Sequence, residues 1–200
     1  MRKMACNASI NPLPSAKKIN LESLKTSEAR FLEVPLSNKR NSMIFVDADA
    51  CPLAIKEILL RAAERTGIGM VFIANHSIPL PKRDNVSFVM VEKGFDVADN
   101  VIVARIQAGD LVVTQDIPLA AEVLAKGAQA MGLRGQVHTA DNIRARLTVR
   151  DFMETMRFSG EHTGGPAPLS TKDRQAFANA LDRYLLIFAR LQEKLAPCPQ

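Results

Sequence analysis

Cysteine and histidine are scarce in this 200-residue chain, which contains three of each. Cys6, Cys51 and Cys198 lie far apart, without the paired spacing of zinc sites or disulfide frameworks. No apolar run approaches the roughly 20 residues of a membrane-spanning helix. No apolar segment follows Arg2 and Lys3 as it would in a secretory signal. These absences argue against a zinc protein and predict a cytoplasmic protein with no membrane partner.

The composition is that of a folded protein, with 47% hydrophobic and 24% charged residues. The net charge of +5 is unevenly distributed. Residues 1–42 contain eight basic and three acidic side chains, whereas residues 43–200 contain 18 of each and are neutral. A basic segment of this kind either extends into solvent, which we favour, or contacts nucleic acid. Net charge alone therefore does not predict a nucleic-acid partner.

Prolines interrupt the first forty residues and allow at most a short helix over 21–32. We therefore expect residues 1–42 to form a poorly ordered basic extension and residues 43–200 to form the folded domain. The sequence gives no prediction of the oligomeric state.

From Met43 onward, short apolar segments alternate with amphipathic ones, which is typical of βαβ units around a parallel sheet. Strands are predicted over 43–46, 70–74, 86–91, 111–114 and 129–131, and helices over 52–65, 96–107, 120–125, 141–156 and 171–195. Wholly apolar strands indicate a sheet covered on both faces. The predicted fold is α/β with a mainly parallel central sheet and a long C-terminal helix, whose apolar stripe we expect to pack on the sheet.

Acidic residues follow the ends of three predicted strands. They are Asp47, Asp49, Asp96, Asp99 and Asp116. Because the carboxyl ends of parallel strands share one edge of a sheet, these side chains converge if the first and fourth strands are neighbours. Asn75 and Thr114 follow strands at the same predicted edge and are secondary candidates.

Carboxylates that converge need neutralisation, since two of them about 4 Å apart repel by roughly 4 kcal/mol at an effective dielectric constant of 20. Either some are protonated, or a hard divalent cation lies between them. Mg²⁺ and Mn²⁺ prefer carboxylate and water oxygens, and a pair of such ions activates water against a phosphodiester. The five aspartates are therefore candidate metal ligands and catalytic residues.

Aspartate is also an ordinary residue at helix N-termini, so Asp49, Asp96, Asp116 and Asp141 each fit a capping role as well. Asp47 lies too far ahead of Pro52 to cap a helix. The sequence leaves both interpretations open. Two weaker candidates are Cys51, a possible nucleophile at a helix start, and the loop that contains Thr163, Gly164 and Gly165, which either closes over a ligand or simply connects two helices.

Five motifs carry a resemblance to a known family. They are Phe45-Val-Asp-Ala-Asp-Ala-Cys-Pro, Gly94-Phe-Asp-Val-Ala-Asp-Asn, Asp110-Leu-Val-Val-Thr-Gln-Asp-Ile-Pro-Leu-Ala, Arg150-Asp-Phe-Met, and Thr163-Gly-Gly-Pro with Asp173-Arg-Gln-Ala-Phe. In this order, over roughly residues 43–184, they resemble the uncharacterised bacterial YaiI/YqxD family. The chain departs from that pattern at Leu133-Arg-Gly, where Pro-Arg-Gly is usual, and in the residues before Met43.

The YaiI/YqxD family is grouped with PIN-like and NYN-type nuclease domains. The resemblance therefore implies a three-layer α/β/α fold in which the five aspartates bind Mg²⁺ or Mn²⁺. Our leading hypothesis is a metal-dependent ribonuclease or related phosphodiesterase acting on RNA. One alternative is a haloacid-dehalogenase-type phosphatase with Asp47 as nucleophile and Thr114 as its second-motif hydroxyl. Another is a non-catalytic module that binds RNA or protein.

Overall fold

A six-stranded sheet forms the centre of the part of the chain that the structure describes, with the strand order β3-β2-β1-β4-β5-β6. The computed structural model describes residues 42–94, 96–159 and 167–195, all within the compact unit Val34–Gln200. The strands are β1 (Met43–Asp47), β2 (Gly69–Ala74), β3 (Val86–Met90), β4 (Leu111–Val113), β5 (Gln129–Met131) and β6 (Val137–His138). The first five are parallel to one another, and β6 is antiparallel to β5.

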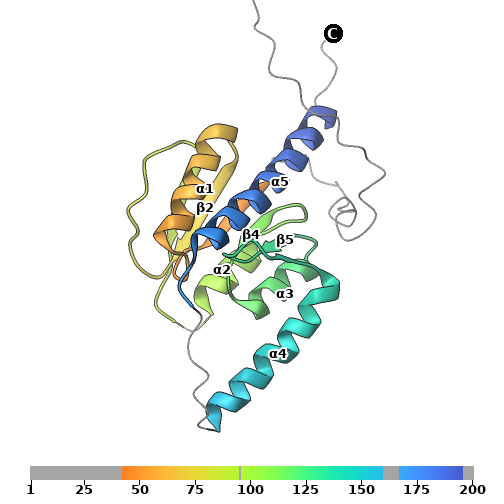
Figure 1. Cartoon of the computed structure of the whole chain (residues 1–200). Helices are drawn as coiled ribbons and strands as arrows, with labels where there is room; N and C mark the ends of the chain where they lie inside the picture. Colours follow the sequence, from red (N-terminus) through yellow and green to blue (C-terminus); the bar gives the residue numbers. More distant parts are fainter. Residues whose placement is uncertain (1–41, 95, 160–166, 196–200) are drawn as a thin grey trace, which may run out of the picture. The chain divides into compact units, whose positions relative to one another are not determined.

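Helices cover both faces of this sheet, so the unit is a three-layer α/β/α structure (Figure 1). The helices are α1 (Leu53–Thr66), α2 (Val97–Arg105), α3 (Ile117–Ala125), α4 (Ala140–Phe158) and α5 (Thr171–Leu195). Helices α1 and α5 contact each other on one face, while α2 and α3 contact each other on the opposite face and α4 packs on α3. This arrangement confirms the predicted fold class, including the long C-terminal helix.

Two hydrophobic layers follow from the alternation of side chains along the strands. Phe45, Val71 and Val112 point to one face, where they form a core with residues of α2 and α3 such as Ile102 and Leu119. The residues that alternate with them point to the other face, toward α1 and α5. Burial of one such side chain contributes about 1.5–3 kcal/mol, so the two layers stabilise the whole sheet.

Helix α5 covers its face of the sheet with an apolar stripe. Phe177, Leu181 and Leu185 are buried, and Tyr184 donates a hydrogen bond of 3.2 Å from its hydroxyl to the Gly109 carbonyl. Burial raises the pKa of Tyr184 well above its usual value, so this hydroxyl remains a donor at neutral pH. The predicted packing of this helix on the domain is confirmed.

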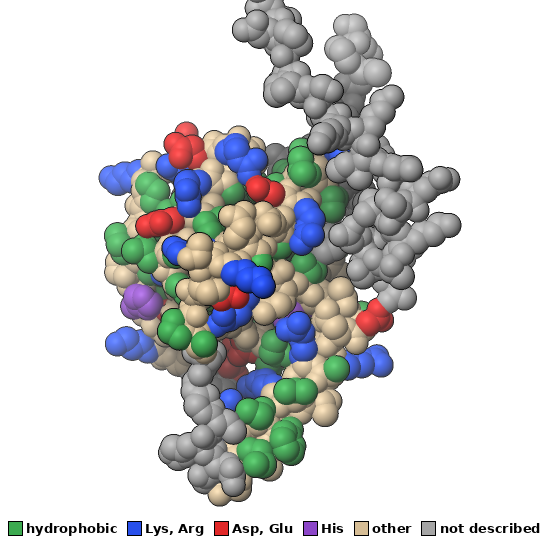
Figure 2. All heavy atoms as spheres, in the orientation of Figure 1, with side chains coloured by type: hydrophobic (Ala, Val, Ile, Leu, Met, Phe, Trp, Pro, Cys, Tyr) green, Lys and Arg blue, Asp and Glu red, His purple; other side chains and the backbone are tan. Residues whose placement is uncertain are grey.

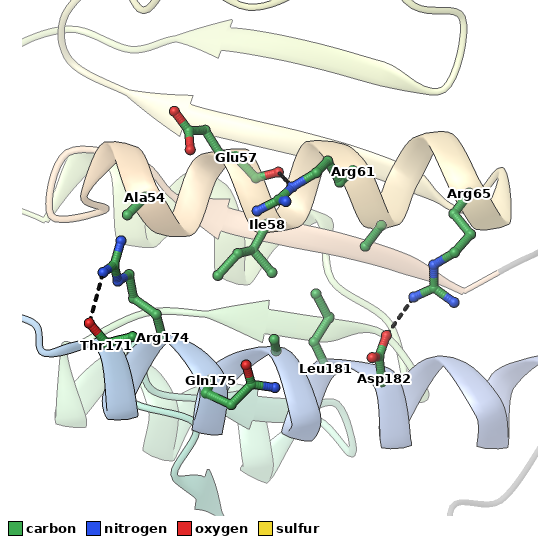
Figure 3. A pocket seen from close by; sticks show the side chains of 12 residues that line it. Ala54, Glu57, Ile58, Arg61, Arg65, Thr171, Arg174, Gln175, Leu181 and Asp182 are labelled. Atoms are coloured by element: carbon green, nitrogen blue, oxygen red, sulfur yellow. Dashed lines mark hydrogen bonds and ion pairs between the residues drawn. The ribbon is translucent and has the colours of Figure 1, made fainter.

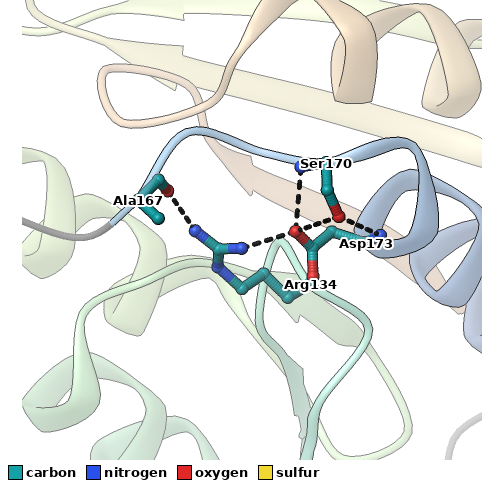
Figure 4. A network of polar contacts seen from close by, with 4 residues as sticks. All are labelled: Arg134, Ala167, Ser170 and Asp173. Carbon is teal, nitrogen blue, oxygen red and sulfur yellow. Dashed lines mark hydrogen bonds and ion pairs between the residues drawn. The ribbon is translucent and has the colours of Figure 1, made fainter.

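A polar network fixes the start of α5 to the turn between β5 and β6 (Figure 4). Arg134 donates to the Asp173 carboxylate at 2.5 Å and to the Ala167 carbonyl. The Ser170 backbone N–H and hydroxyl also donate to Asp173, at 2.9 and 2.7 Å. These donors, chiefly the Ser170 N–H, hold the pKa of Asp173 below its usual value. The network therefore joins two residues that lie 39 positions apart in the sequence.

Several elements differ from the predicted ones, most of them by one or two residues at an end. Strand β6 was not predicted, because two residues are too short to show alternation. Helix α3 begins at Ile117 rather than at residue 120, since Asp116 caps it and a proline lies in its first turn. Helix α2 begins at Val97, one residue after the predicted start. The predicted extension, residues 1–42, lies almost entirely outside the described residues.

The outer part of α4 exposes large hydrophobic side chains. Val149 and Phe152 are each 61% exposed, and Figure 2 shows hydrophobic side chains along this part of the helix.

Within the ranges that the structure describes, no helix has the length and apolar character that crossing a membrane requires.

Candidate metal centre

The strand order reverses between β1 and β4, and this point carries the acidic residues. Strand β1 pairs with β2 on one side and with β4 on the other, with Val46 opposite Val113. Asp47 is the last residue of β1, and Thr114 directly follows β4. Carboxyl-end crevices at such reversal points are the usual ligand sites of open parallel sheets. The condition on which the predicted convergence depended is therefore met.

Asp47 is the buried member of the set, with a relative exposure of 8%. Its Oδ2 accepts a hydrogen bond of 3.0 Å from the Thr114 hydroxyl. Burial raises the pKa of Asp47, and the charges of Asp49 and Asp116 raise it further, while the Thr114 hydrogen bond and the Ala50 N–H lower it. Asp47 thus sits in a field of like charge with few compensating donors.

Asp99 on α2 is affected by the same negative charges. Burial raises its pKa from 3.8 to about 6, and the charges of Asp116, Asp47, Asp96 and Glu122 contribute in that order. Since a carboxylate shifts a neighbour's pKa only over a short range, these side chains form one acidic cluster. Glu122 was missed from the sequence, because the predicted helix began at residue 120 and left its relation to Asp116 unseen.

Asp49 and Asn75 connect the ends of β1 and β2. Both carboxylate oxygens of Asp49 accept from the Asn75 backbone N–H, at 3.0 and 3.1 Å. His76 Nδ1 lies 2.9 Å from Asp49 Oδ1. Asp49 does not cap α1, whose N-cap position is Pro52, so the capping interpretation of Asp49 is wrong. Asn75 takes part through its backbone rather than as a side-chain ligand of the cluster.

Two further capping expectations are corrected and one is confirmed. Asp96 precedes α2 in a left-handed conformation with φ 57° and makes no side-chain cap, so the capping interpretation of Asp96 is wrong. Asp141 lies inside α4, which Thr139 caps. Asp116 does cap α3, with its Oδ1 accepting from the Leu119 N–H at 3.2 Å. Its own N–H donates to the Thr114 hydroxyl at 3.0 Å.

The side chains of this cluster are carboxylates, the kind of ligand that hard divalent cations prefer. Within the described residues, no three acidic, histidine or cysteine side chains are grouped so that they could hold a metal ion. The carboxylates of Asp47, Asp49 and Asp116 are partly occupied by Thr114, Asn75 and Leu119. A carboxylate has further lone pairs to offer. Coordination of an ion would therefore require these carboxylates to come closer together.

Two weaker candidates have different outcomes. Cys51 is buried, and burial raises the pKa of its thiol to about 12, so it is uncharged at neutral pH and the nucleophile interpretation is wrong. Thr163, Gly164 and Gly165 lie outside the described residues.

Asp99→Asn is expected to stabilise the protein at pH 8 but not below pH 4. The folded-state pKa of about 6 exceeds the ordinary 3.8, so the folded protein holds this proton more tightly and loses stability as pH rises between these values. Because Asp99 is half-exposed, the gain on substitution is only about 1 kcal/mol. Urea denaturation at pH 4 and pH 8 measures it. Equal effects at both pH values would show that ionisation of Asp99 does not destabilise the folded protein.

Comparison with known proteins places the chain in a family. A model of a conserved bacterial family, described as the uncharacterised YaiI/YqxD family, matches residues 45–186. The UPF0178 protein of Vibrio cholerae is 61% identical over 142 residues, which cover 71% of this chain and 95% of the relative. The UPF0178 protein of Hydrogenovibrio crunogenus is 56% identical over 147 residues, covering 74% and 97%. No solved structure matches the chain. The chain therefore belongs to the YaiI/YqxD family.

Proposed function

We propose that the acidic cluster binds Mg²⁺ or Mn²⁺ and that the protein hydrolyses phosphodiester bonds of RNA. The observation that carries this proposal is the environment of Asp47. Its carboxylate is buried at the end of β1, and the charges that raise its pKa, those of Asp49 and Asp116, are of the same sign. Such an arrangement is costly unless a cation neutralises it.

The residues of the cluster would hold such an ion from two sides. Asp47 is fixed by burial and by Thr114, and Asp116 is fixed as the cap of α3, so these two define the inner side of the site. Asp49, Asp96 and Asp99 are more exposed and supply ligands from the outer side. A bound divalent ion would lower the pKa of a water molecule and neutralise charge on the phosphate.

Hydrolysis then consumes one water and breaks one P–O bond. The water oxygen becomes bonded to phosphorus, and the departing oxygen takes up a proton from solvent and leaves as a hydroxyl end. A carboxylate of the cluster that is not engaged with the ion accepts the proton of the attacking water.

The test is incubation of the full chain with an end-labelled single-stranded RNA in the presence of Mn²⁺, of Mg²⁺, or of EDTA. We expect shorter products with the ions and none with EDTA. Calorimetric titration of Mn²⁺ into the same preparation reports binding independently. Saturable Mn²⁺ binding without any cleavage would contradict the nuclease and favour the non-catalytic binding module.

One contact favours the phosphatase as a second candidate. The Thr114 hydroxyl lies 3.0 Å from the Asp47 carboxylate across two neighbouring parallel strands, the relation expected of a nucleophile and its second-motif hydroxyl. The raised pKa of Asp47 makes its carboxylate less available as a nucleophile. Incubation with p-nitrophenyl phosphate followed by borohydride reduction separates the two functions, since only the phosphatase traps a phosphorylated Asp47.

A further inference from the structure

An open groove runs between α1 and α5, on the face of the sheet opposite the acidic cluster's helices (Figure 3). Its volume is about 560 Å³, and residues from both helices line it along their length. Ala54 and Thr171, from the first turns of the two helices, line one end, and Arg65 and Asp182 line the other. From Ala54 to Arg65 helix α1 rises by about 16 Å, which is long enough for more than one phosphate of an extended strand.

Three arginines line this groove, and two of them have no acidic partner among the described residues. Arg65 is engaged with Asp182 at 2.5 Å. Arg61 Nε donates to the Glu57 carbonyl at 3.3 Å, and Arg174 donates to the Thr171 hydroxyl at 3.1 Å. Neither bond uses more than one of the five N–H groups of a guanidinium. Figure 3 shows Arg61 on one wall and Arg174 on the other.

The groove opens at the same edge of the sheet as the acidic cluster. Helix α1 follows β1 through the short segment that contains Asp49, so the first turn of α1 lies at the carboxyl edge. Basic and acidic side chains are interspersed on the face seen in Figure 2. A strand bound along the groove would lead toward the cluster and would pass Glu57, an acidic residue of α1 that also lines the groove.

We propose that the α1–α5 groove binds the phosphates of single-stranded RNA next to the bond that the acidic cluster cleaves. The identity of the polymer rests on the proposed nuclease function. Guanidinium groups form paired hydrogen bonds with phosphate oxygens, which matches the free donors of Arg61 and Arg174. Both side chains are exposed, which suits a long polyanion passing over the surface better than a small molecule, since small-molecule pockets bury most of their ligand.

The test is binding of a fluorescent oligouridylate to the full chain in EDTA, measured by anisotropy over a range of salt concentrations. The variant Arg61→Gln/Arg174→Gln removes two phosphate contacts. At about 0.1 M salt this loss weakens binding by roughly 25-fold and reduces the slope of log K against log salt by about 1.4. Asp182→Asn releases Arg65 from its carboxylate partner and is expected to tighten binding.

A matched control removes the same charge elsewhere. Arg105→Gln/Lys126→Gln alters two exposed basic residues at the C-terminal ends of α2 and α3, neither of which lines the groove. This double variant is expected to change affinity little. Equal weakening by both double variants, or no weakening by the first, would contradict the proposal that the groove binds RNA. Arg61→Lys/Arg174→Lys keeps the charge and is expected to restore part of the affinity, which a merely structural defect would not do.

Failure of this inference is distinguishable from failure of the proposed function. In EDTA no divalent ion is present, so binding is measured without cleavage. Weak RNA binding by the wild type that does not depend on Arg61 and Arg174, together with Mn²⁺-dependent cleavage, would contradict RNA binding by the groove. It would not contradict the proposed nuclease activity. Binding that depends on both arginines without cleavage under any ion would overturn the nuclease alone.

Discussion

Asp47→Asn is expected to lower Mn²⁺-dependent RNA cleavage by about 100-fold or more while leaving the protein folded. Even partners outside the coordination shell of a metal site typically contribute about 10–100-fold, and Asp47 is the innermost carboxylate of the cluster. The amide retains an oxygen that can accept from the Thr114 hydroxyl, so the hydrogen bond at the end of β1 and β4 survives. Gel analysis of labelled RNA at matched protein concentrations measures the loss.

The same substitution is expected to raise stability at pH 8 in the absence of metal. Burial and the charges of Asp49 and Asp116 raise the pKa of Asp47, so its ionised form destabilises the folded state above that pKa. An inactive protein that is more stable than the wild type is typical of a functional site rather than of a structural one. Mn²⁺ should stabilise the wild type but not this variant.

Asp84→Asn serves as the matched control for Asp47→Asn. Asp84 is exposed and precedes β3, at the opposite end of the sheet, so its replacement removes the same charge without touching the cluster. Cleavage by Asp84→Asn should equal that of the wild type. Full activity in Asp47→Asn, or equal loss in both variants, would contradict a catalytic role for the acidic cluster.

Gly135→Ala is expected to destabilise the protein by about 3 kcal/mol. Gly135 has φ 76°, which costs an alanine about 1–2 kcal/mol. A Cβ at this position would lie 2.6 Å from the backbone carbon and oxygen of Ala176 on α5, and neither atom can move without moving the helix. Overpacking of this kind adds about 1–3 kcal/mol. Urea denaturation followed by circular dichroism measures the change.

Gly67→Ala separates the two causes. Gly67 ends α1 with φ 71°, but nothing lies within 4 Å of a Cβ placed there, so this variant bears only the backbone cost of about 1 kcal/mol. The difference between the two variants therefore reports the close approach of the β5–β6 turn to α5. Similar losses in both would show that this contact is looser than the backbone positions indicate.

Local patterns in the sequence predicted most of the elements correctly. The strand over 129–131 and the helix over 171–195 have the bounds predicted for them, because an apolar run and a long amphipathic period are each properties of the segment alone. The end of α1 was also predictable, since Gly67 adopts the left-handed conformation that stops a helix. Strand β6 was not, because a two-residue strand exists only through its pairing with β5.

The candidate site was predictable only as a set of residues that could meet. That Asp47, Asp49 and Asp116 follow strands was visible in the sequence, but their proximity depended on β1 lying beside β4. The contribution of Glu122 and the left-handed conformation of Asp96 were not visible, because both depend on where a helix starts within its surroundings. Whether an aspartate caps a helix, as Asp116 does, or accepts from another strand's loop, as Asp49 does, also required the structure.

The sequence by itself determined the α/β class, the alternation of strands and helices, and which acidic residues stand at strand ends, since each depends on the order of residues along one segment. Only the tertiary structure decided the strand order, the burial of Asp47 against Thr114, and the contact of Gly135 with α5. It also brought the arginines of α1 and α5 to one groove. The physical reason is that pKa values, close backbone approach and shared grooves arise between segments, and no single segment of sequence contains them.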